Sequence, residues 1–174
     1  MPLSVTHIIL TIIAVDLVRD YFLKDHKRYF TLHTILIAGI GGILPDIDIP
    51  INWFFNFIGY SFDFLRHRGA THTLFFALIF IIPAVILLKK EKHKQSMNFF
   101  VLSFGILFHL LLDFVIGGGA REGAMWLWPI SNHLYTLDLI GRFDLSALPA
   151  ALDAIILLLW LWHEEAKHKI KDFI

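Results

Sequence analysis

The chain alternates between long apolar stretches and short polar segments. Five stretches of 16 to 20 residues are apolar apart from isolated polar side chains: residues 3–18, 29–44, 69–88, 99–116 and 145–162. An apolar stretch of about 20 residues is long enough to cross a bilayer as a helix. The first stretch lacks a basic start and a small-residue cleavage site, so we interpret it as a retained helix. The pattern predicts an all-α integral membrane helix bundle of about five transmembrane helices, with residues 1–174 forming a single domain.

The segment between the second and third stretches has a different character. Residues 50–65 are rich in Trp, Phe and Tyr but are interrupted by Gly59. Aromatic residues with polar neighbours are typical of the lipid–water interface, so we expect a short interfacial segment. A buried connecting helix is the alternative. Pro45 should end the helix before it, and the glycines of residues 39–42 should let helices approach closely.

Composition supports a membrane protein and limits its chemistry. The chain is 57% hydrophobic, above the roughly 45–50% of soluble domains. Its formal net charge is zero, so we expect no nucleic-acid partner. There is no cysteine, which excludes a thiolate metal site and a disulfide framework. Any bound metal must be held by His, Asp, Glu or backbone oxygen, and ten histidines are available.

The basic residues indicate an orientation in the membrane. Of the 15 lysines and arginines, 11 lie in residues 19–28, 89–94 and 167–171. Cytoplasmic loops carry an excess of Lys and Arg. Five spans would place these three segments together on the cytoplasmic side. The amino terminus and the loops 45–68 and 117–144 would then lie on the non-cytoplasmic side of the cell membrane.

The same topology gathers candidate metal ligands on the non-cytoplasmic face. They lie near the ends of their stretches at similar depth: His7, Asp46, Asp48, His67, His72, His109 and Asp113. We place His67 in a loop and His72 one turn into the third helix, with Thr71 or Thr73 near the helix start. Other histidines belong elsewhere. We expect solvated side chains among the lysines for His26, His93, His163 and His168, and a helix contact for His33.

These residue types suit a divalent metal. His109 and Asp113 are four residues apart, so they share one helix face. A catalytic zinc ion needs three protein ligands and water, so seven candidates favour two ions over one. Imidazole suits zinc, and the carboxylates keep manganese possible. The alternative is a structural polar network between helices. Arg68 could hold a phosphate by bidentate hydrogen bonds or contact a lipid headgroup.

The residues quoted so far resemble a known family. Its motifs correspond here to Gly-Ile-Leu-Pro45-Asp46-Ile-Asp48, His67-Arg68-Gly-Ala-Thr71-His72-Thr, His109-Leu-Leu-Leu-Asp113 and Trp128-Pro129. They resemble the YdjM-type (DUF457) membrane-bound metal-dependent hydrolases. The resemblance implies an integral membrane, metal-dependent hydrolase.

The order of the motifs is also similar, more distantly, to zinc-dependent phospholipase C and P1 nuclease. Those proteins use a further His-x-x-x-Glu or His-x-x-x-Asp. Here His133 is followed at that spacing by Leu137, with Asp138 one residue later. Whether His133 or Asp138 joins the site is therefore left open.

The function expected is metal-dependent hydrolysis of a phosphoester in a membrane lipid or lipid-linked substrate, at the non-cytoplasmic face. We expect Asp46, Asp48 and Arg68 to serve catalysis, with one aspartate as general base. A metal-ion transporter could use the same ligands, and a structural membrane protein is a third reading. Transport sites usually lie near the bilayer midplane, whereas these ligands crowd toward one face, which favours hydrolysis.

Overall fold

The described part of the chain is helical, as the apolar pattern predicts. A computed structural model describes residues 4–23, 29–62, 64, 67–117, 123–139, 142 and 149–168. Its longer helices are α1 (Ser4–Leu17), α2 (Leu32–Ile43), α3 (Asp48–Phe57), α4 (Leu74–Lys89), α5 (His93–Ile116) and α7 (Pro149–His168). Short π- or 3₁₀-helical pieces join them: η1 (Val18–Phe22), η2 (Leu44–Ile47) and η4 (Ala70–His72). Extended pairing in these residues is limited to one bridge between Ala124 and Tyr135.

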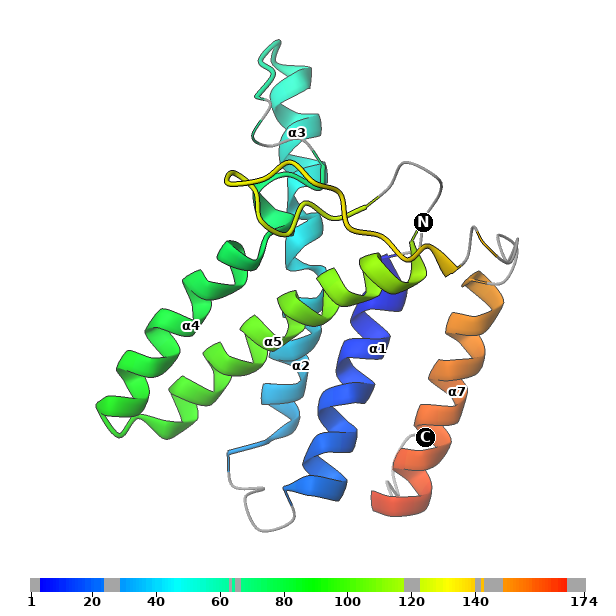
Figure 1. Cartoon of the computed structure of the whole chain (residues 1–174). Coiled ribbons are helices and arrows are strands. Elements are labelled where there is room, and N and C mark those ends of the chain that lie inside the picture. The colour runs from blue at the N-terminus through cyan, green and yellow to red at the C-terminus, as the bar shows by residue number, and fades with distance from the viewer. Residues whose placement is uncertain are drawn as a thin grey trace.

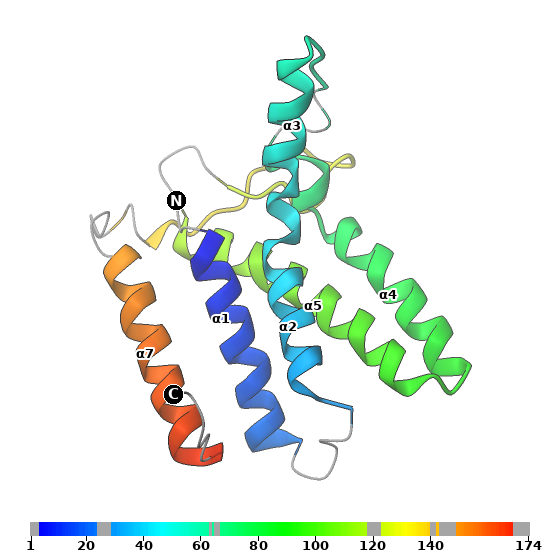
Figure 2. The same cartoon turned by 180° about the vertical axis from the view of Figure 1, so that it is seen from behind.

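The helices form a bundle with two orientations. α1 packs between α2 and α7, and these three helices run side by side (Figures 1 and 2). α4 and α5 form an antiparallel hairpin inclined to them, and α5 packs along α2. The starts of α1, α4 and α7 and the end of α5 lie at one end of the bundle, which is the upper end in Figure 1. Segments far apart in sequence therefore meet at that end.

Two helical rods in the described part of the chain are long and apolar enough to cross a bilayer. They are Leu32–Phe57, which joins α2, η2 and α3, and His93–Ile116, which is α5. α4 is apolar but shorter, with Pro83 inside it. The described bounds of α1, α2, α4, α5 and α7 overlap all five stretches expected from sequence.

The chain does not stop being helical at Pro45. α2 ends at Ile43, as expected before a proline, but the chain continues as the 3₁₀ turn η2. Pro45 occupies the first turn of η2, where a missing N–H costs nothing. α3 then extends the rod beyond the rest of the bundle (Figure 1). Its Trp53 and Phe57 are 68% and 78% exposed, so the alternative of a buried connecting helix is wrong.

Close packing of α2 on its neighbours depends on glycine. A Cβ added at Gly41 would collide with the Leu102 carbonyl oxygen, and one at Gly105 would collide with backbone of α2. A Cβ at Gly42 would lie 2.6 Å from the hydroxyl oxygen of Thr11 in α1. The prediction that residues 39–42 allow close helix approach is confirmed. This packing brings α1, α2 and α5 together directly beneath the candidate site.

We expect Gly105→Val to separate α2 from α5, because the new side chain has backbone rather than a flexible side chain to displace. Overpacking of this kind destabilises by about 1–3 kcal/mol. Thermal unfolding in detergent should show a lowered midpoint. Phe104→Val is the matched control, since Phe104 is 40% exposed on the same helix. Equal midpoints for the two variants would contradict the close contact.

Candidate metal centre

All seven candidate ligands come together at one end of the bundle. His7 lies in the first turns of α1, Asp46 in η2, and Asp48 at the start of α3. His109 and Asp113 lie one turn apart in α5, and their side chains are buried. The remaining two, His67 and His72, belong to the segment before α4. Within the described residues, four separate segments thus supply one buried cluster.

Asp48 organises the segment before α4. Its carboxylate lies 3.1 Å from His67 Nδ1 and accepts hydrogen bonds from the Arg68 backbone N–H at 3.1 Å and the Thr71 hydroxyl at 3.0 Å. Arg68 has a positive φ of 67°, an uncommon backbone conformation for a residue with a side chain. The carboxylate of Asp48 therefore stabilises a tight turn that directs His67 and His72 inward.

The expected position of His72 was wrong. His72 lies in η4 rather than one turn into α4, because α4 begins only at Leu74. Thr73 is extended and its hydroxyl accepts a hydrogen bond from the Phe76 N–H at 3.1 Å, which caps the helix. The expectation that Thr71 or Thr73 marks the helix start is confirmed for Thr73. The extended backbone at Thr73 leaves His72 outside the helix and inside the cluster.

The rings of His72 and His109 direct their Nε2 atoms toward each other. His109 Nδ1 lies 2.7 Å from the Gly42 carbonyl oxygen. A carbonyl oxygen only accepts, so His109 Nδ1 carries the hydrogen and Nε2 is a lone-pair acceptor in the neutral ring. His72 Nδ1 lies 3.1 Å from the Thr71 hydroxyl and 3.3 Å from Asp48 Oδ2. The Nε2 atoms of His72 and His109 face each other at 3.3 Å.

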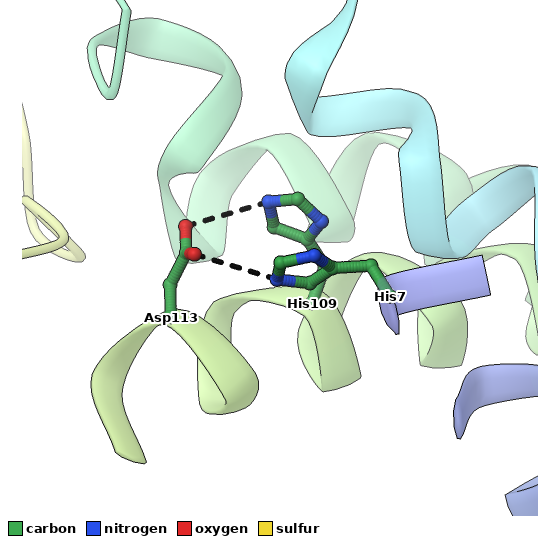
Figure 3. A group of neighbouring side chains, drawn as sticks. All are labelled: His7, His109 and Asp113. Carbon is green, nitrogen blue, oxygen red and sulfur yellow. Dashed lines mark ion pairs between the residues drawn. The ribbon is translucent and has the colours of Figure 1, made fainter. Parts of the chain in front are cut away.

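Two carboxylates flank this pair of Nε2 atoms. Asp46 Oδ1 lies 3.5 Å from His72 Nε2 and 3.6 Å from His109 Nε2. Asp113 Oδ2 lies 3.7 Å and 3.4 Å from the same two atoms. His7 stacks on the His109 ring at a centroid distance of 4.0 Å, and its Nε2 lies 3.4 Å from Asp113 Oδ1 (Figure 3). Neither ring nitrogen of His7 has a hydrogen-bond partner among the described residues.

This donor set fits a divalent metal. Three overlapping groups have ligand atoms within 4.8 Å of one another: His7, His109 and Asp113; Asp46, His72 and His109; and Asp48, His67 and His72. Two imidazoles on one tetrahedral zinc, each at about 2.0–2.1 Å, have nitrogens about 3.3–3.4 Å apart. The His72–His109 separation agrees with that value. In each ring the other nitrogen contacts an oxygen, the arrangement usual for metal-ligating histidine.

Charge in the cluster also favours a cation. Asp46, Asp48 and Asp113 bring three carboxylates, and Arg68 Nη2 lies 3.8 Å from Asp113 Oδ1. One guanidinium offsets only one of the three negative charges. Burial disfavours the charged form of His72, but hydrogen bonds to Asp46 and Asp48 and the charges of Asp48 and Asp113 outweigh burial and raise its pKa to about 8. Below that pH, His72 holds a proton that a metal ion must displace.

Several other polar residues lie away from this cluster. His133 is exposed and its ring packs on Tyr135, while Asp138 lies beside Gly117. Neither belongs to the groups of described residues that could hold a metal ion. His93 is exposed, as expected. His33 is also exposed, so its expected helix contact is wrong. His26 and the side chain of His168 lie outside the described residues.

An ion-pair network at the opposite end of the bundle was not expected. Arg19 is buried, with its guanidinium 2.7 Å from Asp16, 3.1 Å from Asp20 and 3.8 Å from Glu164 of α7. His163 was expected to be solvated, but its side chain is only 24% exposed and its ring lies 3.2 Å from the Tyr21 hydroxyl. The signal in the sequence was Asp16, an acidic residue inside an apolar stretch. Its partners on α7 could not be identified from spacing.

The fold and this site define an all-α membrane protein with a buried His/Asp cluster able to hold a metal ion. The profile of the YdjM inner membrane protein family matches residues 1–171, and the chain belongs to this family. The chain is also 32% identical over 137 residues to the inner membrane protein YbcI of Escherichia coli (strain K12). That alignment covers 74% of this chain and 76% of YbcI. No solved structure shows significant similarity.

Purified protein should carry about one equivalent or more of a divalent transition metal per chain. The double variant His72→Ala, His109→Ala should lose most of it, because the two facing Nε2 atoms disappear. Elemental analysis of detergent-purified protein measures this. The matched control is His33→Ala, His93→Ala, which removes two exposed histidines. Equal metal content in both double variants would refute the ligand assignment.

Proposed function

We propose that this protein is a membrane-bound metal-dependent hydrolase that cleaves a phosphoester in a lipid or lipid-linked substrate at the non-cytoplasmic face. The observation that carries the proposal is the pair of Nε2 atoms of His72 and His109, 3.3 Å apart and flanked by the buried carboxylate of Asp113 and the partly buried one of Asp46. The family resemblance of the motifs supports the same class of reaction. The helix bundle by itself does not indicate hydrolysis, so the proposal depends on this site.

The ligands form overlapping groups around the two facing Nε2 atoms. His72 and His109, with Asp46 or Asp113, would hold one ion, which leaves Asp48 and His67 for a second. Asp46 Oδ1 lies within 3.6 Å of both ring nitrogens, so Asp46 would either bind that ion or act as a general base beside it. Zinc suits this mixture of imidazole and carboxylate, and manganese is the alternative. Such ions supply Lewis-acid activation of water and of a phosphoryl oxygen.

The two aspartates of the Asp46-x-Asp48 motif would have different roles. Asp48 contacts His67, the Arg68 backbone, Thr71 and His72, so it positions the ligand-bearing turn. Asp46 accepts one hydrogen bond, from the Ser4 hydroxyl, on Oδ2, and its Oδ1 faces the two Nε2 atoms. Asp46 is therefore the better candidate for a general base that takes a proton from the attacking water.

Arg68 would bind the phosphate of the substrate. Its guanidinium is mostly buried and lies 3.8 Å from Asp113 at the edge of the cluster. A guanidinium beside a dinuclear centre can donate two parallel hydrogen bonds to a phosphate and stabilise charge that develops during cleavage. A lipid-headgroup contact without catalysis remains the other reading of Arg68, and activity measurements separate the two.

The distribution of charge supports a site away from the cytoplasm. α1, α4 and α7 each begin at the end of the bundle that holds the cluster (Figure 1), and the described basic residues at or just after their other ends include Arg19, Lys89 and Lys167. The positive-inside rule assigns the basic end to the cytoplasm.

A metal-ion transporter with the same ligands is the alternative function. Beneath the cluster, however, Val15, Ile35, Ala38 and Val101 form an apolar core between α1, α2 and α5. The buried polar side chains of α1 below the cluster are Thr11 and Asp16, and Arg19 already pairs with Asp16 at 2.7 Å, so an ion moving toward the cytoplasm would have to displace that guanidinium. The structure therefore supports hydrolysis better than transport.

Arg68→Gln should lower turnover of a phospholipid by roughly 10²-fold while bound metal stays nearly unchanged, because a charge-stabilising donor is removed without loss of a ligand. The control is Arg142→Gln, which alters an exposed arginine on the same expected face. The assay uses vesicles with labelled phospholipid in the membrane and a metal-sensitive dye inside. A metal-dependent dye signal without any phosphoester cleavage would reject hydrolysis and favour the transporter.

A cysteine at Asn56 should react with a membrane-impermeant reagent in intact cells, whereas one at Gln95 should react only after lysis. Both positions are exposed, one near the end of α3 and the other in the first turn of α5, beside the basic turn. The chain has no native cysteine, so the labelling has no background from the protein itself. The reverse pattern would place the metal centre on the cytoplasmic side.

A further inference from the structure

A pocket beside Asp46 opens toward the surface of the α2–η2–α3 rod. It has a volume of about 350 Å³ and lies between the first turn of α1 and the rod. Ile43, Ile47 and Ile49 form its apolar wall, while Ser4 and Asp46 provide its polar groups. Small-molecule sites usually span about 300–1,000 Å³ and combine apolar walls with a few polar groups. The pocket matches both features.

Asp46 joins this pocket to the metal centre. Its side chain is 14% exposed, whereas those of His72, His109 and Asp113 are 5% exposed or less. One carboxylate oxygen accepts the hydrogen bond from Ser4 at 3.0 Å on the pocket side. The other oxygen lies within 3.6 Å of the two facing Nε2 atoms. A ligand that reaches Asp46 through the pocket is therefore in contact with the centre.

An apolar stripe leads along α2 to the pocket. Leu36, Ile40, Ile43 and Ile47 are 60%, 54%, 36% and 42% exposed. Their spacing of four, three and four residues places them on one face of the rod. In a membrane protein such a face lies against lipid chains. The stripe and the pocket thus form one continuous apolar path from the side of the bundle to Asp46.

We propose that this pocket holds the apolar chain of a phosphorylated lipid that enters from the bilayer, with its phosphate at the Asp46 end. The proposal rests on the proposed function, because the metal centre and Arg68 are what would hold the phosphate. Water has a separate approach at His67, whose side chain is 28% exposed and lies outside the pocket lining. The apolar chain and water therefore reach the centre at different residues.

A second, entirely apolar pocket provides a comparison for non-specific lipid contact. It has a volume of about 190 Å³ and is lined by Val15, Phe30, Phe100, Phe104 and neighbouring apolar residues. No polar side chain lines it, so it offers nothing that distinguishes a phosphorylated lipid from any other. Among the described residues it serves as an internal control for non-specific lipid contact.

The binding test uses metal-loaded full-length protein in phosphatidylcholine vesicles. The probes are a long-chain alkyl phosphate with a photoreactive diazirine in the chain and the matching alcohol without phosphate. We expect the phosphate probe to label the peptide containing Ile43 and Ile47 several-fold more than the alcohol does, and removal of metal to abolish the difference. Labelling near Phe100 and Phe104 should be equal for both probes. Equal labelling at both places would overturn the proposal.

The activity test separates this proposal from the proposed function. Ile47→Trp should fill the pocket and lower cleavage of a long-chain phospholipid by about tenfold or more, with little effect on a short water-soluble phosphoester. Ile79→Trp adds the same side chain at an exposed position of α4, outside both the stripe and the pocket, and should change neither. Metal content reports folding of each variant.

Unchanged long-chain cleavage in a metal-loaded Ile47→Trp protein would reject the pocket and leave hydrolysis standing. Phosphate-dependent labelling in a wild-type protein that cleaves neither substrate would support the pocket and reject hydrolysis.

Discussion

Taking a carboxylate out of water costs several kcal/mol unless charge partners and hydrogen bonds replace the water. This protein removes three carboxylates wholly or largely from water in one cluster, those of Asp46, Asp48 and Asp113. Asp48 is stabilised by the turn that it organises, through His67, the Arg68 N–H and Thr71. Asp46 and Asp113 instead face the Nε2 atoms of two imidazoles. A cation between these two carboxylates and the two imidazoles would offset the cost of burying the carboxylates where α1, the rod and α5 meet.

The backbone of the rod sets the geometry of this centre. Pro45 ends the α-helical hydrogen bonding of α2, and the 3₁₀ turn η2 carries Asp46 before α3 begins at Asp48. The short turn lets one aspartate reach the facing histidines while the other reaches the segment before α4. Beneath it, Gly41 and Gly42 allow α5 and α1 to pack closely. The Gly42 carbonyl, exposed to His109 by this approach, fixes the tautomer of that ring. One glycine-rich turn thus serves both packing and ligand orientation.

Periodicity and charge predicted the larger features from sequence. The apolar stretches located α1, α2, α4, α5 and α7, and the position of polar residues in or just beyond the ends of these stretches gathered all seven members of the cluster. What periodicity could not predict depends on tertiary contacts. The position of His72 depends on the cap at Thr73, and the positioning role of Asp48 depends on a turn with positive φ at Arg68. The burial of Arg19 and the partial burial of His163 depend on α7 packing against α1, which no local pattern records.

The two ends of α1 show why the same residue types need not mean the same chemistry. Asp16, His163 and Glu164 also lie close enough to hold a metal ion. There, however, Arg19 lies 2.7 Å from Asp16, and Lys167 lies 3.1 Å from Asp20, so two protein cations already neutralise most of the negative charge. A metal at that end would have to displace them. At the other end, three carboxylates have one guanidinium nearby and two ring nitrogens aimed at each other. Coordination geometry alone treats the clusters alike, but a metal would have to displace two protein cations at one end and only a proton on His72 at the other, which favours the end that contains His72 and His109.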